Sequence, residues 1–262
     1  MVRGIAIGLV TALLTAAPAL ARERAPGAPG GKADWASADK EGFGTAASRE
    51  SRVWFTLRDA DMTEVHYPDL GHPSVRHLLF MVDGKRVTTG TVSQDTLTYT
   101  QTSEHADWRL IRTYATDPER SVVLIKVRFE SKDGEDHDVE LELDPQLYND
   151  GSDDVGWTRG HALLAHDTRI ASALRARPSL TRTSSGYKGR TDDLLEHTYD
   201  ALRPGNIVQQ AHTRLNGRER KDMTLALGFA ARGSAALDAA TDALDDGFEA
   251  VASAYKAGDF IL

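Results

Sequence analysis

The sequence of 262 residues contains no cysteine. A disulfide framework and a lipid-bearing N-terminal cysteine are therefore excluded, and stability must come from burial of a core alone. Because small domains bury a smaller fraction of their surface than large ones, this absence favours one large packed domain over a string of small ones.

The chain also has no run of lysine and arginine, and its formal net charge is −8. A nucleic-acid partner or an anionic membrane surface requires a basic patch, so we exclude both classes of partner. The sequence lacks the G-x-S-x-G motif of serine hydrolases and the G-x-x-x-x-G-K-[ST] loop that binds nucleotide phosphates. No motif implies a cofactor.

Long hydrophobic runs are absent apart from one at the N-terminus, which covers residues 4–20, follows an arginine and ends in small residues. We predict a signal peptide over residues 1–21, cleaved after Ala21, and therefore export to the periplasm or the medium without a membrane attachment of the mature chain. The alternative is a membrane anchor, but the run is short and rich in alanine and glycine. Residues 22–34 are rich in proline and glycine, which predicts a flexible lead-in.

From residue 52 to residue 230 the apolar residues alternate with polar ones. In HDVELELD and SVVLIKVRFES every second side chain is apolar, as a half-buried strand requires. Turn signals such as Asp83-Gly84, Asp133-Gly134 and Asn216-Gly217 separate these segments. With one polar face per strand and no helical crossovers, we predict a mainly β fold, a large antiparallel β-sandwich over residues 35–232.

The periodicity changes near the C-terminus. From Ser234 to about Lys256 the apolar residues are spaced by seven, four, three and four, which lines one face of a helix. Ser234 is the expected N-cap, and Gly247 is a point where the helix bends. We predict that residues 233–262 form an amphipathic linker helix and a truncated end.

Four segments, in this order along the chain, share the pattern of one known family. They are WFTLRDADMTEVHYPDLGHPSVRHLLFMVDG (54–84), LDPQLYNDGSDDVGW (143–157), GYKGRTDDLLEHTYDALRPGNIVQQAHTRL (186–215) and LALGFAARGSAALDAATDALDDGFEAVASAYKAG (225–258). Together they resemble the N-terminal domain of bacterial glucoamylases and glucodextranases. The resemblance implies a large antiparallel β-sandwich, joined by a helical linker to an (α/α)6-barrel that hydrolyses α-glucosidic bonds with inversion.

In that family both catalytic glutamates lie in the barrel, so the resemblance implies that this chain alone is not an enzyme. The expected role is an accessory domain that supports or orients the barrel, which is the missing partner. Asp259 stands where family members usually carry an aromatic residue, which raises the alternatives of a truncated or frameshifted gene product and of a stand-alone exported glucan-binding protein. An accessory domain should leave the apolar face of its terminal helix partly exposed, whereas a self-contained protein should bury it.

Aromatic residues are scarce, at 7% of the chain, so any binding of α-glucan should be weak. The aromatic candidates for contact with carbohydrate or with a catalytic domain are Tyr67, Trp157, Phe248 and Tyr255. Tyr67 lies in EVHYPDLGH, which we interpret mainly as a strand that ends at a Tyr-Pro turn.

The loop at residues 144–154 is the richest in acidic residues. Asp150, Asp153 and Asp154 are the candidates for a Ca²⁺ site, although their spacing is not that of an EF-hand. We favour a long turn held by hydrogen bonds from side chains to the backbone. The spacing of His66, His72 and His77 fits no compact zinc motif, so we predict no metal there.

Overall fold

The computed structural model describes residues 22–27, 31–189 and 194–256. The predicted signal peptide and the end of the chain after residue 256 lie outside the described residues, and so does Asp259. Within the described residues, none of the helices is both long enough and apolar enough to cross a membrane.

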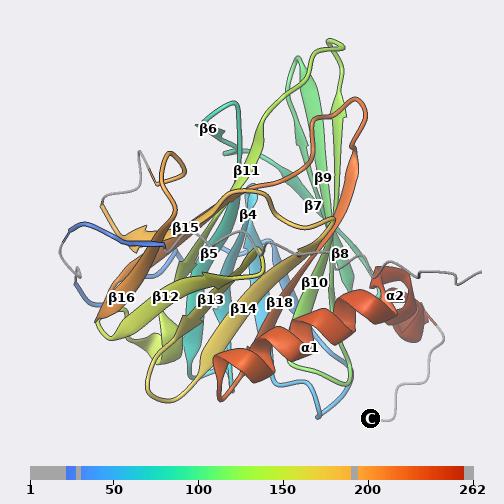
Figure 1. The fold of residues 1–262 in the computed structure, drawn as a ribbon. Helices are drawn as coiled ribbons and strands as arrows, with labels where there is room; N and C mark the ends of the chain where they lie inside the picture. The colour runs from blue at the N-terminus through green and yellow to red at the C-terminus, as the bar shows by residue number, and fades with distance from the viewer. Residues whose placement is uncertain (1–21, 28–30, 190–193, 257–262) are drawn as a thin grey trace, which may run out of the picture.

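In the described parts of the chain, the strands form two stacked sheets, one of ten strands and one of eight (Figure 1). The ten-stranded sheet has the order β1 (Glu23–Arg24), β16 (Tyr199–Gly205), β12 (Asp154–Arg159), β13 (Ala162–His166), β14 (Ala171–Arg177), β18 (Asp222–Ala230), β10 (Val122–Ser131), β9 (Trp108–Thr116), β8 (Thr98–Glu104) and β7 (Thr91–Asp95).

The eight-stranded sheet has the order β15 (Thr183–Tyr187), β17 (Ile207–His212), β11 (Val139–Pro145), β5 (Pro73–Val82), β4 (Asp61–His66), β3 (Trp54–Arg58) and β2 (Gly42–Thr45), with β6 (Lys85–Arg86) paired to β5. Neighbouring strands run antiparallel, except that β1 runs parallel to β16. The predicted fold class, a mainly β antiparallel sandwich with a C-terminal helical segment, is confirmed.

The main core lies between the two sheets and follows the predicted alternation. On β11, Val139, Leu141 and Leu143 are buried, while Glu140 and Glu142 point to the other face. On β10, Ile125 and Val127 are likewise buried in this core. Burial of these alternate side chains fixes the register, because a slip by one residue would turn every apolar side chain outward.

The helical segment is divided into α1 (Gly233–Asp246) and α2 (Phe248–Lys256). The division falls at Gly247, whose φ of 88° suits glycine, so the predicted bend is a full break. The prediction of Ser234 as N-cap is wrong, because α1 already begins at Gly233 and Arg232 occupies the cap position without a side-chain hydrogen bond.

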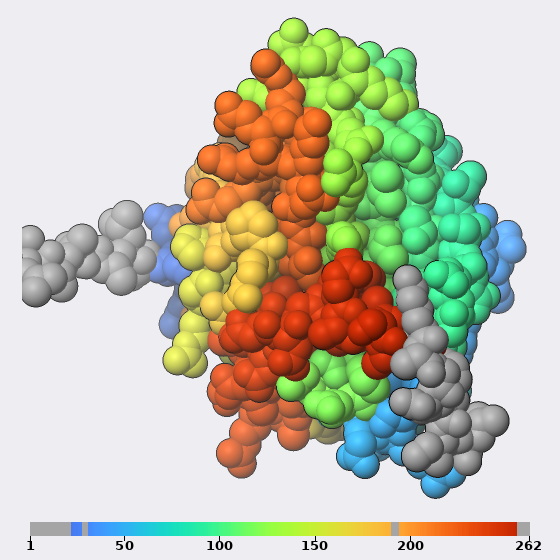
Figure 2. Space-filling model, turned by 90° about the vertical axis from the view of Figure 1, so that its right-hand side faces the viewer, coloured from blue at the N-terminus to red at the C-terminus, as the bar shows by residue number. Residues whose placement is uncertain are grey.

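Both helices lie on the outer face of the ten-stranded sheet, α1 mainly over β14 and β18 and α2 over β9 and β10 (Figures 1 and 2). They cover a second apolar cluster, in which Leu124 and Ala226 of the sheet contact Ala240 and Leu244 of α1. The start of β10 is therefore apolar on both faces, and its polar alternation begins at Lys126, which forms an ion pair with Glu249 of α2.

The segment predicted as a flexible lead-in, residues 22–34, makes defined contacts in the part that the structure describes. Glu23–Arg24 forms the edge strand β1, and the Ala25 amide donates to the Asp200 carbonyl at 3.0 Å. The Arg22 guanidinium forms an ion pair with Asp200 at 2.9 Å. These contacts join backbone and side-chain groups far apart in the sequence, which the composition of the segment does not reveal.

The alternation of apolar and polar residues expected over residues 52–230 is interrupted in β4. The pairing of β4 with its neighbours shifts near Val65, and Glu64 has a φ of 43°, in the left-handed region. This bulge inserts one residue, so Met62 and Val65 both reach the core.

Candidate functional site

The outer face of the eight-stranded sheet carries a patch of paired polar side chains. Alternation along β11 directs Glu140 and Glu142 to this face, and the antiparallel register places them opposite His212 and Gln210 of β17. His77 joins them from β5, on the other side of β11. We call these five residues the polar sheet face.

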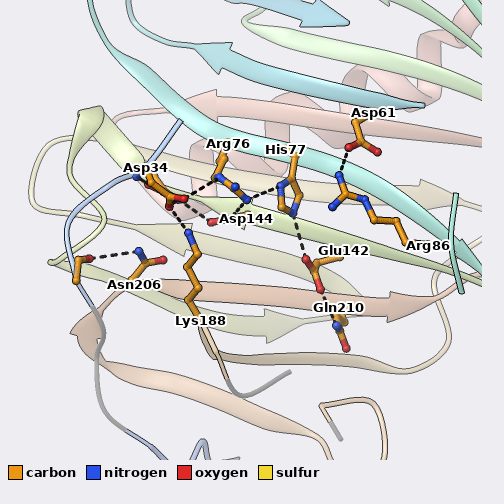
Figure 3. Close-up of polar contacts among 12 residues, drawn as sticks. Asp34, Asp61, Arg76, His77, Arg86, Glu142, Asp144, Lys188, Asn206 and Gln210 are labelled. Atoms are coloured by element: carbon orange, nitrogen blue, oxygen red, sulfur yellow. Dashed lines mark hydrogen bonds and ion pairs between the residues drawn. The ribbon is translucent and has the colours of Figure 1, made fainter. Parts of the chain in front are cut away.

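Two hydrogen bonds and one close contact between a histidine and a glutamate connect the members of the polar sheet face. The His77 Nε2 atom lies 3.1 Å from Glu142 Oε1, and Gln210 Nε2 donates to Glu142 Oε2 at 2.7 Å (Figure 3). His212 Nε2 lies 3.1 Å from Glu140 Oε1. Each glutamate is thus held in place by a neighbour from an adjacent strand.

The electrostatics of Glu142 favour its ionised form. Burial raises the pKa of this carboxyl, but the hydrogen bonds from His77 and Gln210, together with the charges of His77 and Arg86, outweigh burial, so its pKa lies below the ordinary value. A general acid of a glycosidase needs a raised pKa, so that it carries a proton at neutral pH. Glu142 therefore suits hydrogen-bond acceptance and does not suit proton donation.

A pocket of about 510 Å³ lies over this part of the sheet. Four of its lining residues, Glu140, Glu142, Gln210 and His212, belong to the polar sheet face. The other lining residues are Met81, Gly84, Arg182, Leu195 and Glu196. The volume falls within the range of small-molecule sites, and the lining offers both donors and acceptors.

A second polar network lies beside this pocket and fastens the segment before β2 to the sheet (Figure 3). Asp34 forms ion pairs with Lys188 and with Arg76, the latter at 3.3 Å, and its amide donates to Gln146 at 2.7 Å. Asp144, only 1% exposed, accepts from Gln146 at 3.2 Å. Burial raises the pKa of Asp144 despite nearby positive charges, and its side chain is enclosed by the sandwich, so we interpret this network as structural.

The structure places Tyr67 and Trp157 in half-buried positions. The Tyr67 ring stacks on Phe229 with 5.3 Å between centroids and packs against the main core. Trp157 contacts His166 edge-on, and its ring lies against Gly233 at the start of α1. Both rings therefore have one side occupied by the protein itself, and their predicted contact with carbohydrate or another domain stays a prediction.

The structure does not support Phe248 and Tyr255 as surface anchors. Their side chains are 8% and 2% exposed, and both pack with Leu244 and Val251 against the outer face of the ten-stranded sheet. The Tyr255 hydroxyl donates to the Thr116 carbonyl. The apolar face of the helices is used internally, because the outer side of β9 and β10 supplies an apolar surface for it.

The acidic loop does not bring its three metal candidates together. Asp150 accepts hydrogen bonds from Ser152, Asp153 lies 3.7 Å from the Arg169 guanidinium, and Asp154 is fully buried. No cluster of three or more His, Asp or Glu side chains with metal-binding geometry occurs in the described ranges. The side-chain to backbone bonds that we favoured for this loop are present, as between Asp150 and the Ser152 amide.

The three histidines of residues 66–77 also have separate partners. His66 Nδ1 lies 3.0 Å from the Leu70 carbonyl, His72 pairs with Asp69 at 2.7 Å, and His77 belongs to the polar sheet face. The loop therefore forms a turn stabilised by local hydrogen bonds.

Sequence reasoning missed the polar sheet face, although part of its signal is visible. Alternation alone places Glu140 beside Glu142, and Gln210 beside His212, on one face of each strand. The sequence does not show that β11 and β17 are neighbouring strands. Their pairing brings the polar faces of the two strands together in the wall of one pocket.

Comparison with known proteins gives a consistent family assignment. The family model described as glucodextranase, domain N, matches residues 25–258. A glucoamylase from Clostridium sp. (strain G0005) is 28% identical over 254 residues, which cover 87% of this chain and 36% of the relative. The chain thus spans little more than a third of this curated relative.

Solved structures agree with the sequence comparison. A bacterial glucoamylase complexed with acarbose superposes with a TM-score of 0.81 and 27% identity, over 89% of this chain and 38% of that one. An inverting mannosidase from Bacteroides thetaiotaomicron has a TM-score of 0.54 and 9% identity, over 79% of this chain and 31% of that one. The second likeness shows the fold alone.

Proposed function

Because the chain belongs to the glucodextranase domain N family, we propose that it is the non-catalytic N-terminal accessory domain of a glucoamylase-like α-glucan hydrolase. In this role it supports or orients a catalytic (α/α)6-barrel. The observation that carries the proposal is the match of residues 25–258 to that one domain. The chain spans only 36% of the Clostridium glucoamylase and 38% of the bacterial glucoamylase of known structure.

Two carboxyl groups, Asp154 and Glu142, illustrate what a catalytic pair would need. Inverting hydrolysis needs a protonated acid and an ionised base that both reach the sugar. Asp154 has a strongly raised pKa, but its side chain is fully buried. Glu142 faces a pocket, but its pKa is lowered. Neither residue combines access with a proton to donate.

The buried apolar face of α1 and α2 bears on how a barrel would be held. We expected this face to be partly exposed in an accessory domain and buried in a self-contained protein, and it is buried. A barrel must therefore contact other surfaces. The same burial favours the alternative function, a stand-alone exported glucan-binding protein. We propose export to the periplasm or the medium because residues 1–21 have the pattern of a signal peptide.

The test uses the purified chain and the separately produced catalytic domain of the Clostridium glucoamylase. Alone, the chain should release no glucose from maltotetraose or dextran. Added to the catalytic domain, it should raise the melting temperature or the half-life of that domain, because an interdomain contact stabilises both partners by mass action. Glucose release by the pure chain would overturn the non-catalytic role, and an unchanged catalytic domain would overturn the accessory role.

A further inference from the structure

The pocket over β11 and β17 has a floor that is fixed before any ligand arrives. Glu142 is hydrogen-bonded to His77 at 3.1 Å and accepts from Gln210 at 2.7 Å, and His212 Nε2 lies 3.1 Å from Glu140 Oε1. Gln210 is 6% exposed. Groups held in this way lose little conformational freedom on binding, so their free atoms are preorganised for a ligand.

Several polar atoms of this pocket keep spare hydrogen-bonding capacity. Among the described residues, the Arg182 guanidinium has no hydrogen-bond or ion-pair partner, although it is exposed at the pocket rim. Within the same residues, His212 contacts only one carboxylate oxygen of Glu140, so the second oxygen can accept a hydrogen bond from a ligand. The side-chain carbonyl of Gln210 likewise has no hydrogen-bond partner there. The pocket thus offers free donors on one side and free acceptors on another.

We propose that this pocket binds a neutral polyhydroxylated ligand, specifically a segment of α-linked glucan. Each sugar hydroxyl donates one hydrogen bond and accepts others, so it fits a lining that contains both Arg182 and the acceptors Glu140 and Gln210. The apolar side chains of Met81 and Leu195, which also line the pocket, offer contact to the C–H faces of a pyranose ring. The choice of glucan rests on the proposed function.

The charge of the lining argues against the competing ligand classes. The carboxylates of Glu140 and Glu142 would repel a phosphate or another anion. For a metal cation these carboxylates are already partly satisfied by histidines, and the described residues contain no metal-binding cluster. The lining of this pocket includes no Phe, Tyr or Trp side chain on which a pyranose ring could stack, which limits affinity, so we expect a dissociation constant on the order of 1 mM.

The experiment is a titration of the full chain with maltotetraose and isomaltotetraose, followed by calorimetry or by NMR chemical shifts. The wild type should bind at least one of them with saturation below about 20 mM. Arg182→Ala should weaken binding about tenfold, as the loss of one charge-assisted hydrogen bond predicts. Arg159→Ala is the matched control, since Arg159 is also exposed but lies on β12 of the other sheet.

Each outcome is decisive. Absence of binding in a wild-type chain that melts cooperatively would overturn the inference, as would equal weakening by Arg182→Ala and Arg159→Ala. Binding of Ca²⁺ or spermidine at this pocket in place of the oligosaccharides would overturn the ligand class. The barrel-stabilisation test is independent of this site, so failure here leaves the accessory role standing, and failure there leaves the pocket standing.

Discussion

The Leu147 amide donates to Oδ2 of Asp154 at 3.0 Å, while Oδ1 of the same carboxyl group has no hydrogen-bond partner among the described residues. The Asp154 side chain is 0% exposed. Burial, together with the nearby charges of Asp153 and Asp167, raises its pKa to about 9 against the single hydrogen bond that lowers it. Asp154 is therefore a protonated, internal group that closes the loop onto the sandwich.

This raised pKa makes stability depend on pH. Aspartates of the unfolded chain titrate at about 3.9, so between about pH 4 and pH 9 the unfolded state releases a proton that the folded state keeps. The stability of the wild type should therefore fall as pH rises through this window. Asp154→Asn removes the titration but keeps an oxygen that accepts from Leu147.

We expect the free energy of unfolding of Asp154→Asn, relative to the wild type, to increase from pH 5 to pH 8 by up to about 1.4 kcal/mol per pH unit. Urea denaturation at both pH values measures it. Asp150→Asn is the control, because hydrogen bonds from Ser152 lower the pKa of Asp150 and place its window below about pH 4. If the difference in unfolding free energy between Asp154→Asn and the wild type did not change with pH, Asp154 would not be protonated in the folded protein.

A second prediction concerns Arg112, which is 0% exposed between the sheets. Its guanidinium donates to the Ala60 carbonyl and, at 2.6 Å, to Ser103 Oγ, and it lies 5.8 Å from the centre of the Phe80 ring. Arg112→Ala leaves these acceptors unpaired beside a cavity, so we expect a loss of about 3–5 kcal/mol in the free energy of unfolding.

Arg112→Met tests the origin of that loss. Methionine fills much of the volume without introducing a charge, and we expect it to recover at least about half of the lost stability, because burial of the guanidinium itself is costly. Urea denaturation of both variants gives the comparison. Equal losses for alanine and methionine would show that the hydrogen bonds outweigh the packing.

The sequence predicted what depends on local periodicity. Val139, Leu141 and Leu143 face the core as their spacing requires, and the apolar spacing of residues 237–255 correctly indicated helix. Binary alternation specifies strands and faces because one face of each strand must leave water.

Features that depend on contacts between residues far apart in the sequence could not be predicted from local patterns. Burial of Tyr255 requires the apolar outer side of β9 and β10, and the strand at Glu23–Arg24 requires the edge of β16. The polar sheet face likewise exists only because β17 lies beside β11. The bulge at Glu64 interrupts the alternation of apolar and polar residues, and no proline or glycine within β4 indicates it in the sequence.

A third prediction tests how closely α1 lies on the sheet. A Cβ atom at Gly228 of β18 would lie 2.7 Å from the Ala236 carbonyl oxygen and 3.2 Å from the Ala240 Cβ atom, both in α1. Gly228→Ala should therefore displace the helix and cost about 1–3 kcal/mol, as overpacking does. Thermal and urea unfolding measure the loss. Gly31→Ala, where the added atom meets open space, should leave stability unchanged, and an equally stable Gly228→Ala would contradict the close approach.

The last prediction concerns the hold of β1 on the sheet edge. The Arg22 side chain forms an ion pair with Asp200 at 2.9 Å and donates to the Thr183 and Tyr199 carbonyls, so one guanidinium joins three points of the sandwich. The Ala25 amide, bonded to the Asp200 carbonyl, reports on the same edge. Arg22→Ala should loosen β1 and speed amide exchange at Ala25 by at least about fivefold, which corresponds to the loss of about 1 kcal/mol.

Arg24→Ala supplies the matched control for this experiment, because Arg24 lies on the same strand with an exposed side chain. Exchange at Ala25 should be unchanged in that variant, while global stability measured by urea should stay within about 0.5 kcal/mol of the wild type in both, as expected for a terminal strand. Similar acceleration in the two variants would mean that general charge, and not the specific hold by Arg22, keeps β1 in place. Exchange that is slow in both would mean that backbone pairing with β16 is sufficient.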